Sequence, residues 1–281
     1  MKTFRDRVAV VTGGASGIGR ALAERFAADG MKVVLADVEE GPLAATAREM
    51  TAAGATVLAV RTDVAKAADV EALAERAWSA YGAVHVLCNN AGVGGGGLSW
   101  ECSLAEWEWV LGVNLWGVIH GVRAFVPRML AGGDEGHVVN TASVAGLSTA
   151  PGMGSYNVSK FGVVALSEVM HHEFTLLGAK LRVSVLCPAW VNTRIADADR
   201  NRPVEAAANG AANPAFEAMR DAVRNAVAAG LPPARVAEMV LDAIRDERFY
   251  VLTHPDFVPV VRHRMEGLLE GRNPSFGGFG R

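Results

Sequence analysis

Short apolar runs rich in β-branched residues alternate along the chain with longer segments in which apolar residues recur at helical spacing. A run that is apolar throughout is typical of a strand covered on both faces, and its alternation with helices predicts parallel strands joined by crossover helices. The runs interpreted as strands are Val8–Val11, Lys32–Ala36, Thr56–Arg61, Val84–Cys88, His137–Ser143, Leu181–Cys187 and Phe249–Leu252. The segments interpreted as helices are Arg20–Asp29, Leu43–Ala53, Val70–Tyr81, Leu104–Leu130, Ser155–Leu177 and Pro232–Asp246. The expected fold is α/β, with three layers: a doubly wound parallel sheet of about seven strands and helices on both faces.

No internal repeat or second hydrophobic core interrupts this pattern, so residues 1–281 are expected to form one domain. Residues 194–230 shift to alanine, asparagine and charged residues, with helical potential but no strand pattern. A long insertion beyond a strand's carboxyl end is expected to be a lid over a ligand. Residues 253–281 are expected to form a surface or subunit-contacting arm.

Charge and composition exclude several classes of function. With a net charge of −3 and no basic run, the chain is not expected to bind nucleic acid or a membrane. The sequence shows no membrane span and no signal-peptide core, so a cytoplasmic location is expected. The cysteines have no metal-binding spacing, and Cys88 and Cys187 are expected to be buried free thiols. No metal site is expected from the histidines, because His85 stands alone in a strand and the adjacent His171 and His172 point to different sides of a helix.

A glycine-rich turn joins the first strand to the first helix. Gly13, Gly17 and Gly19 permit a tight turn and allow a pyrophosphate to approach the backbone and the positive end of the helix. The second strand ends at Asp37, about 20 residues later, where a dinucleotide-binding Rossmann fold holds the adenosine ribose. The carboxylate of Asp37 would repel the extra phosphate of NADP, and the neighbouring Ser16 and Val38 are not basic. The expected cofactor is therefore NAD, and Asp37 disfavours NADP.

Tyr156 and Lys160 lie four positions apart, which places them on one face of a helix about one turn apart. A nearby ammonium favours the phenolate and lowers the pKa of a tyrosine. Ser143, at the end of the fifth predicted strand, supplies a hydroxyl that can hold a substrate oxygen against the phenol. Together these residues predict proton transfer to or from an alcohol or ketone.

Three further features carry weaker expectations. The glycine run 94–97 either forms part of a substrate pocket wall or is a tolerant linker. Tryptophans at helical spacing, which predict core packing or a subunit interface, are Trp100, Trp107, Trp109 and Trp116. Asn114 is unfavourable in the middle of a helix, which indicates a specific hydrogen-bonding role.

In combination and order, these motifs resemble the short-chain dehydrogenase/reductase family in its smaller, single-domain form. Thr12-Gly13-x-x-x-Gly17-x-Gly19 resembles the family's cofactor turn, Asp63-Val64 its adenine-contacting pair, and Asn89-Asn90-Ala91-Gly92 the segment that steadies the sheet. Asn114, Ser143, Tyr156 and Lys160 fit the family's catalytic tetrad. The segment 188–193 resembles the one beside the nicotinamide, with Ala189 where the family usually has glycine. The cofactor-binding residues that the resemblance implies are Gly13, Ser16, Gly17, Ile18, Gly19, Asp37, Asp63, Val64, Asn90, Ala91, Gly92, Tyr156, Lys160, Pro188, Val191 and Thr193.

The resemblance implies hydride transfer between NAD and a secondary alcohol or its ketone. Tyr156 would be the general acid/base, and Lys160 would lower its pKa and hold the nicotinamide ribose. Ser143 would orient the substrate oxygen, and Asn114 would hold a water linking Lys160 to solvent. The family also implies a homodimer or homotetramer built on the two long helices.

The expected substrate is hydrophobic or alicyclic, because the expected pocket wall is mostly apolar. Its residues are Ser143, Val144, Leu147, Met153, Tyr156, Trp190, Val191 and Ile195. Two alternatives stay open: an NADP-type keto or acyl-carrier reductase, and a catalytically idle dinucleotide-binding protein. The complete tetrad counts against the idle protein.

Overall fold

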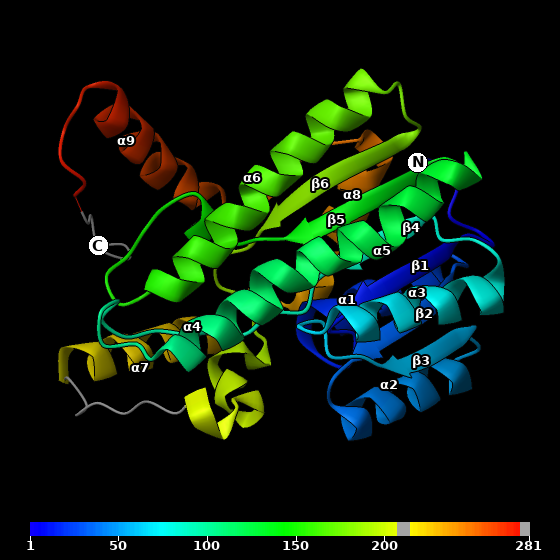
Figure 1. Ribbon diagram of the computed structural model, residues 1–281, viewed down its shortest axis with the longest axis horizontal. Helices are drawn as coiled ribbons and strands as arrows, with labels where there is room; N and C mark the ends of the chain where they lie inside the picture. Colours follow the sequence, from blue (N-terminus) through cyan, green and yellow to red (C-terminus); the bar gives the residue numbers. More distant parts are fainter. Residues whose placement is uncertain (207–213, 276–281) are drawn as a thin grey trace.

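The structure, a computed structural model, describes residues 1–206 and 214–275. Its centre is a seven-stranded parallel sheet with the strand order β3-β2-β1-β4-β5-β6-β7, which confirms the expected doubly wound α/β fold. Figure 1 shows the sheet between two layers of helices. The strands are β1 (Val8–Thr12), β2 (Lys32–Asp37), β3 (Val57–Arg61), β4 (Val86–Asn89), β5 (Gly136–Thr141), β6 (Leu181–Cys187) and β7 (Tyr250–Leu252).

The helices divide between the two faces of the sheet as the strand sequences require. Along β2, Val33 and Leu35 pack into one core layer while Val34 and Ala36 pack into the other, because successive side chains point to opposite faces. The first layer is closed by α1 (Gly17–Ala28), α2 (Glu40–Ala52) and α8 (Pro233–Asp246). The second is closed by α3 (Ala67–Tyr81), α5 (Gly117–Gly132) and α6 (Gly154–Leu176).

The long helix expected from Leu104 to Leu130 is interrupted. It consists of α4 (Leu104–Leu111), a π-helical turn η1 (Gly112–Trp116) and α5. By length and composition alone the continuous stretch Leu104–Gly132 is apolar enough to cross a membrane, but 44% of its most apolar window is buried against the protein. Its apolar character is thus explained in part by packing.

Trp100 and Trp116 are 80% and 52% exposed. Of the two roles expected of the tryptophans, core packing is therefore wrong for these two, and a subunit interface stays a prediction. Trp116 lies on the outer side of the π-helical turn, where its ring stands 5.8 Å from that of His120. The fifth strand also ends at Thr141 rather than Ser143, because the chain turns at Ser143 into a short 3-10 helix, η2 (Val144–Gly146).

The segment after β6 has local helical structure, as its composition predicts, and its role as a lid stays a prediction. It begins with two 3-10 helices, η3 (Arg194–Asn201) and η4 (Val204–Ala206), and continues after an undescribed part with α7 (Pro214–Ala228). Residues 207–213 of the expected lid lie outside the described residues. The ends of the segment are tied together, since Val191 and Leu231 form a parallel bridge and the Leu231 amide donates to the Trp190 carbonyl at 2.9 Å. The arm expected at 253–281 contains η5 (Pro255–Phe257) and α9 (Val258–Leu269), which has no buried residue.

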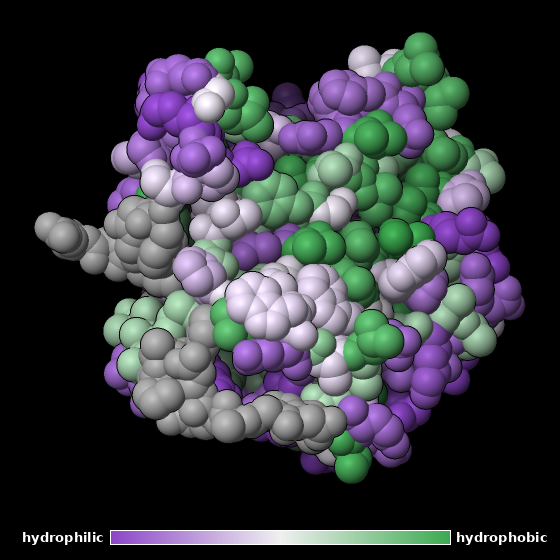
Figure 2. All heavy atoms as spheres, turned by 60° about the vertical axis from the view of Figure 1, so that its left-hand side comes forward, coloured by the Kyte–Doolittle hydropathy of each residue, from purple (hydrophilic) through white to green (hydrophobic). Residues whose placement is uncertain are grey.

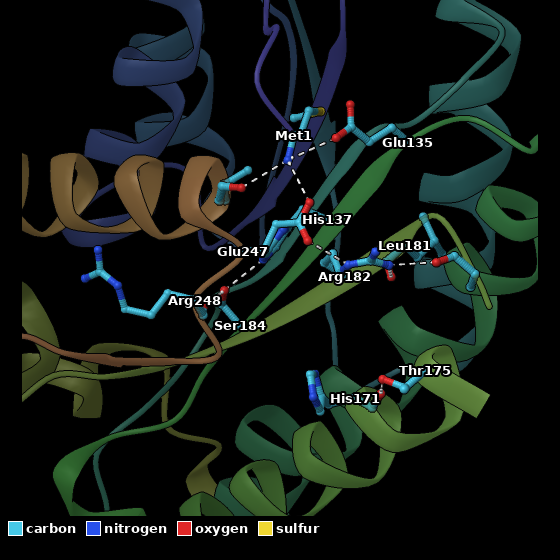
Figure 3. Close-up of polar contacts among 12 residues, drawn as sticks. Met1, Glu135, His137, His171, Thr175, Leu181, Arg182, Ser184, Glu247 and Arg248 are labelled. Carbon is cyan, nitrogen blue, oxygen red and sulfur yellow. Dashed lines mark hydrogen bonds and ion pairs between the residues drawn. The ribbon is translucent and has the colours of Figure 1, made fainter. Parts of the chain in front are cut away.

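A cluster of polar contacts surrounds the buried His137 near the amino end of β5 (Figure 3). His137 is fully buried, and its Nε2 lies 2.8 Å from the Ser184 hydroxyl, which itself donates to the Arg248 carbonyl at 2.6 Å. Because that hydroxyl has one proton, Nε2 must carry the imidazole proton. Nδ1 has no partner among the described residues. Burial, reinforced by the charges of the N-terminal amine and Arg182, lowers the pKa of His137 to about 3.

Acid should therefore destabilise the protein through His137. The pKa of His137 in the folded state lies below the ordinary value of 6.5. Its contribution to the free energy of unfolding is therefore complete above pH 6.5 and is lost as pH falls towards 3. Between pH 7 and 4.5, wild type should lose about 2–3 kcal/mol of unfolding free energy that the variant His137→Leu does not lose. Urea denaturation at the two pH values measures this difference. Equal losses in both proteins would contradict it, and the exposed His172→Leu is the matched control.

Candidate active site

Three strands meet at the carboxyl edge of the sheet through the side chains of Thr12 and Asn90. The Thr12 hydroxyl accepts hydrogen bonds from the amides of Asn90 (2.9 Å) and Ala91 (3.1 Å) and donates to the Cys88 carbonyl at 3.3 Å. The side-chain amide nitrogen of Asn90 donates to the Thr12 carbonyl at 3.0 Å, and its side-chain oxygen accepts from the Thr141 hydroxyl at 3.3 Å. The ends of β1, β4 and β5 are thus fixed relative to one another.

The glycine turn between β1 and α1 is tightly packed, and its glycines cannot be replaced without movement. A Cβ on Gly19 would lie 2.1 Å from the Gly13 carbonyl oxygen, and one on Gly13 would lie 2.9 Å from the Ala91 Cα. Gly13 and Gly17 also have φ values of +66° and +54°, which favour glycine. The turn therefore leaves a backbone surface without side chains at the amino end of α1, where unpaired amides attract an anion. These residues fit the pyrophosphate of a dinucleotide.

Asp37, at the end of β2, is bonded back to this turn. Its carboxylate accepts hydrogen bonds from the amides of Ala15 and Glu39, both at 3.0 Å. Burial raises the pKa of Asp37, and the two amide hydrogen bonds oppose that rise. The next expected pair lies beyond β3: the Asp63 carboxylate accepts from the Ala65 amide at 3.1 Å and pairs with Lys66 at 3.2 Å.

Tyr156, Lys160 and Ser143 come together as their spacing predicts. Lys160 is 3% exposed, and its ammonium donates to the Thr141 carbonyl at 3.0 Å and stands 5.6 Å from the centre of the Tyr156 ring. The Ser143 hydroxyl donates to the Pro188 carbonyl at 3.2 Å and accepts from the Ala145 amide at 3.1 Å. Lys160 and Ser143 are thus held by backbone groups at the ends of β5 and β6.

The pKa of Tyr156 differs from the expectation based on sequence, which was that Lys160 lowers it. Burial raises the pKa of Tyr156, and hydrogen bonding with Ser143 opposes the rise without cancelling it. Burial also lowers the pKa of Lys160 to about 8. The ammonium lies over the phenol ring and is itself desolvated, so its attraction for a phenolate does not offset the burial of the oxygen. A net lowering of the tyrosine pKa by Lys160 is therefore not found in this structure.

Asn114 occupies the π-helical turn and is fully buried. Its side chain bonds both backbone groups of Val93, accepting from the amide at 2.8 Å and donating to the carbonyl at 2.9 Å. It also donates to the Ser159 hydroxyl at 3.2 Å. A Cβ on Gly92 would lie 3.4 Å from Asn114 Oδ1 and 3.6 Å from Lys160 Nζ, so Gly92 lies beside both polar groups. The hydrogen-bonding role expected of Asn114 is confirmed, and π-helical turns are frequent at functional sites.

The chain just before the segment 194–230 contacts the glycine turn. A Cβ on Gly17 would lie 3.1 Å from the Thr193 methyl group, and Thr193 accepts a hydrogen bond from the Ile195 amide at 3.4 Å. A pocket of about 610 Å³ opens here between α1, α7 and the residues that follow β6, lined in part by Ser16, Gly17, Arg20, Thr193 and Arg194. This pocket is large enough to hold part of a dinucleotide.

The expected substrate-wall residues are distributed around this edge. Met153 pairs with Gly97 in a parallel bridge, and the Ile195 carbonyl lies 3.3 Å from where a Gly94 Cβ would be. The Trp190 ring stands 6.5 Å from that of Phe257, at the start of the C-terminal arm. Leu147 packs against a cluster on α6 and β6 instead of standing free, so its side chain contributes to the core.

The glycine run 94–97 is not a tolerant linker. A Cβ on Gly95 would lie 2.5 Å from Val110 and 3.1 Å from the Glu106 carboxylate. The Gly97 amide donates to the Gly152 carbonyl at 2.8 Å, just before the helix that carries Tyr156. Close packing therefore requires glycine here.

Sequence reasoning missed Thr141 and Glu106 and named Thr12 only as part of the glycine-turn motif. Thr12 and Thr141 join the strand ends, and Glu106 is a buried acid, 4% exposed, that contacts the glycine run and Arg202. The only local signal for the two threonines is the position of each at a strand end. Glu106 resembles a solvent-facing residue in sequence, because its partners lie far along the chain.

Comparisons with known proteins agree with this architecture. The family model described as short chain dehydrogenase matches residues 7–203. The 1-deoxy-11-beta-hydroxypentalenate dehydrogenase of Streptomyces avermitilis is 38% identical over 90% of this chain and 86% of that protein. The C alpha-dehydrogenase of Sphingobium sp. is 30% identical over 98% of this chain and 89% of that protein. A crystal structure of a short chain dehydrogenase/reductase from Burkholderia phymatum, in complex with NAD, has a TM-score of 0.95 and 49% identity over 98% of this chain and 99% of that one.

The glycine turn, the buried lysine beside a tyrosine and the matched length thus lead to one assignment. The chain belongs to the short-chain dehydrogenase/reductase family, whose members bind NAD(P) and act on the CH–OH groups of small molecules.

Proposed function

We propose that this protein is an NAD-dependent dehydrogenase that interconverts a hydrophobic or alicyclic secondary alcohol and its ketone, with Tyr156 as general acid/base. The observation that carries the proposal is the placement of Tyr156, Lys160 and Ser143 at the carboxyl edge of the sheet, beside the glycine turn. This arrangement puts a phenol, an ammonium and a hydroxyl within reach of a carbon-bound oxygen, where an open α/β sheet binds its ligands.

The residues have distinct roles in this proposal. In the direction of oxidation, the phenolate form of Tyr156 takes the hydroxyl proton of the substrate while hydride leaves the carbinol carbon. When bound, the dinucleotide supplies the hydride acceptor, whose oxidised ring is positively charged. Ser143 orients the substrate oxygen, and Lys160 stabilises the phenolate and holds a ribose hydroxyl. Asn114 fixes the Val93 backbone beside Lys160 and holds a water that links the ammonium to solvent.

We assign the dinucleotide to the residues that line the edge from β2 to the lid. The glycine turn and Ser16 hold the pyrophosphate, Asp37 the adenosine ribose, and Asp63 and Val64 the adenine. The remaining proposed contacts, along the nicotinamide half, are Ile18, Asn90, Ala91, Gly92, Pro188, Val191 and Thr193. The NAD-bound relative, which is 49% identical, supports the choice of NAD.

The preference for NAD should depend on the charge of Asp37. Asp37→Asn is expected to lower the ratio of kcat/KM for NAD to that for NADP by about 10–100-fold, because the amide still accepts a hydrogen bond but no longer repels a phosphate. Steady-state kinetics with both cofactors measures the ratio. Glu40→Gln, which removes an exposed charge from the first turn of α2, should leave it unchanged. An unchanged ratio in Asp37→Asn would show that another residue selects the cofactor.

The substrate is proposed to be apolar because the side chains around the site are apolar. The residues that we assign to the substrate side are Met153, Trp190 and Ile195, with Val144 following Ser143. Val191 packs in the core beside them. The named substrate of the Streptomyces relative, a hydroxypentalenate, is consistent with a hydroxyl group on a larger carbon skeleton.

We also propose a homodimer or homotetramer, with α5 and α6 in the interface. Hydrophobic residues gather on this side of the molecule (Figure 2). Exposed apolar side chains on and beside these helices include Trp116, Val158, Val169, Leu176 and Leu177. Clusters of this kind mark association surfaces.

The test of function is absorbance of the reduced nicotinamide during incubation with NAD or NADP and a panel of terpenoid, steroid, aromatic and sugar alcohols. Turnover of apolar alcohols with NAD is the expected result. The matching ketones and an acyl-carrier substrate are tested in the same way with NADH or NADPH, and turnover only of these with NADPH would favour a reductase instead. Tight NAD binding without any turnover would indicate an idle binding protein.

A further inference from the structure

Glu106 is a buried carboxylate that joins three separate segments of the chain. It lies in the first turn of α4, where the Ser103 hydroxyl accepts its amide hydrogen bond at 3.1 Å and caps the helix. Its side chain does not complete this cap. One carboxylate oxygen accepts from the Gly96 amide at 3.3 Å, and the other pairs with Arg202 of the lid. A carboxylate with only 4% exposure requires such partners.

On one side, Glu106 is connected to the segment that carries Tyr156. The Gly96 amide that it binds lies next to Gly97, which pairs with Gly152 and Met153. Those two residues lead directly into α6. Because a Cβ on Gly95 would collide with Val110, the glycine run is packed directly against α4. A shift of α4 would therefore also move the glycine run.

On the other side, Glu106 anchors the lid. Arg202 pairs with it and also donates to the Asp199 carboxylate at 2.8 Å and the Ala206 carbonyl at 3.1 Å. Its guanidinium lies 4.9 Å from the centre of the Trp109 ring, on the same helix as Glu106. The Arg202 side chain is only 18% exposed, so this ion pair is shielded from solvent.

The lid has a second, separate anchor at Glu39, two residues after Asp37. Arg200 donates to Glu39 at 2.8 Å, and Asn201 does so at 2.9 Å. Burial alone would raise the pKa of Glu39, but these hydrogen bonds and the charges of Arg200 and Arg194 lower it. The segment 194–206 is therefore held at the β2 side by Glu39 and at the α4 side by Glu106.

We propose that Glu106 is a positioning residue that sets the separation between the lid and the Tyr156 segment, and so determines the shape of the substrate side of the site. The inference rests on the proposed function. Glu39 would hold the cofactor side of the same lid. Both carboxylates bind lid arginines, but only Glu106 also binds the glycine run that leads to α6, and this separates their expected effects.

The test compares Glu106→Gln with two variants that lose the same kind of charge. Glu106→Gln is expected to raise KM for the alcohol by about tenfold or more while kcat and the dissociation constant of NAD change by less than about threefold. Glu39→Gln should instead weaken NAD binding. Glu75→Gln, which removes an exposed pair with Arg128, should change neither.

A purely structural role of Glu106 is tested by removing both charges. Glu106→Gln with Arg202→Gln leaves no unpaired buried charge, so folding stability should recover relative to Glu106→Gln. The KM is expected to stay high in the double variant, because the link between lid and glycine run is still missing. A KM that returns to the wild-type value together with stability would overturn the proposal, as would a Glu106→Gln variant with unchanged KM.

Limited trypsin digestion separates this inference from the proposed function. Cleavage after Arg194 and Arg200 in the lid should be faster in Glu106→Gln than in wild type or Glu75→Gln, whether or not any alcohol is turned over. If wild type oxidises no alcohol, the proposed function fails while this readout still applies. Equal cleavage rates in all three proteins would mean that Glu106 does not hold the lid.

Discussion

Tyr156→Phe is expected to lower kcat by at least about 10²–10⁴-fold, because the phenol oxygen is the only group proposed to exchange a proton with the substrate. The ring remains, so its contact with Lys160 and the packing of α6 should be retained. NAD binding is expected to change by less than about threefold. Stopped-flow or steady-state absorbance measures turnover, and fluorescence titration measures NAD binding.

A matched control distinguishes loss of the proton carrier from loss of local structure. Ser143→Ala removes the hydroxyl that interacts with the phenol but leaves the proton carrier in place. It should reduce kcat less than Tyr156→Phe does. Activity of Tyr156→Phe close to that of wild type would refute the assignment of this residue.

Lys160→Met is expected to inactivate the enzyme and to make the unliganded protein more stable at pH 7. Burial lowers the pKa of Lys160 to about 8 from 10.5, so folding a charged lysine at pH 7 costs about 3 kcal/mol. Loss of the hydrogen bond to the Thr141 carbonyl offsets part of that gain. A net stabilisation of about 1–3 kcal/mol is expected.

The sign of this effect can be checked by its pH dependence. Between pH 8 and 10.5 the unfolded chain holds the lysine proton and the folded protein does not, so the wild type gains stability from this group as pH rises. The advantage of Lys160→Met should therefore shrink between pH 8 and 10. Urea denaturation at pH 7 and pH 10 measures it. A variant less stable than wild type at pH 7 would show that the buried ammonium is compensated by its surroundings.

Most of the fold is encoded locally and could be predicted. Strands such as Val8–Thr12 are apolar at every position because both faces are covered, and the glycine turn follows directly. Parallel strands joined by crossover helices can then be arranged in only a few strand orders. The ends of the elements were less predictable. Ser143, for example, was expected to belong to β5, but its side chain caps η2 instead.

The part of the site that could be predicted is also local. Tyr156 and Lys160 lie on one helix turn, and Asp37 ends a strand, so spacing alone brings them to the same edge. The remaining features depend on contacts between distant segments. The π-helical turn at Asn114 is fixed by the Val93 backbone, and the burial that raises the pKa of Tyr156 comes from the whole site. Glu106 and Arg202 are 96 positions apart, and neither has a sequence signal for the other.

The central claim is hydride transfer from a secondary alcohol with Tyr156 as the base. The most direct measurement uses an alcohol deuterated at the carbinol carbon, with NAD and either wild type or Tyr156→Phe, followed by mass analysis of the reduced cofactor. We predict that wild type forms deuterated NADH. Tyr156→Phe should form no detectable deuterated NADH in the same time, although it binds NAD. Equal deuterium transfer by both proteins, or none by wild type on any alcohol, would contradict the account.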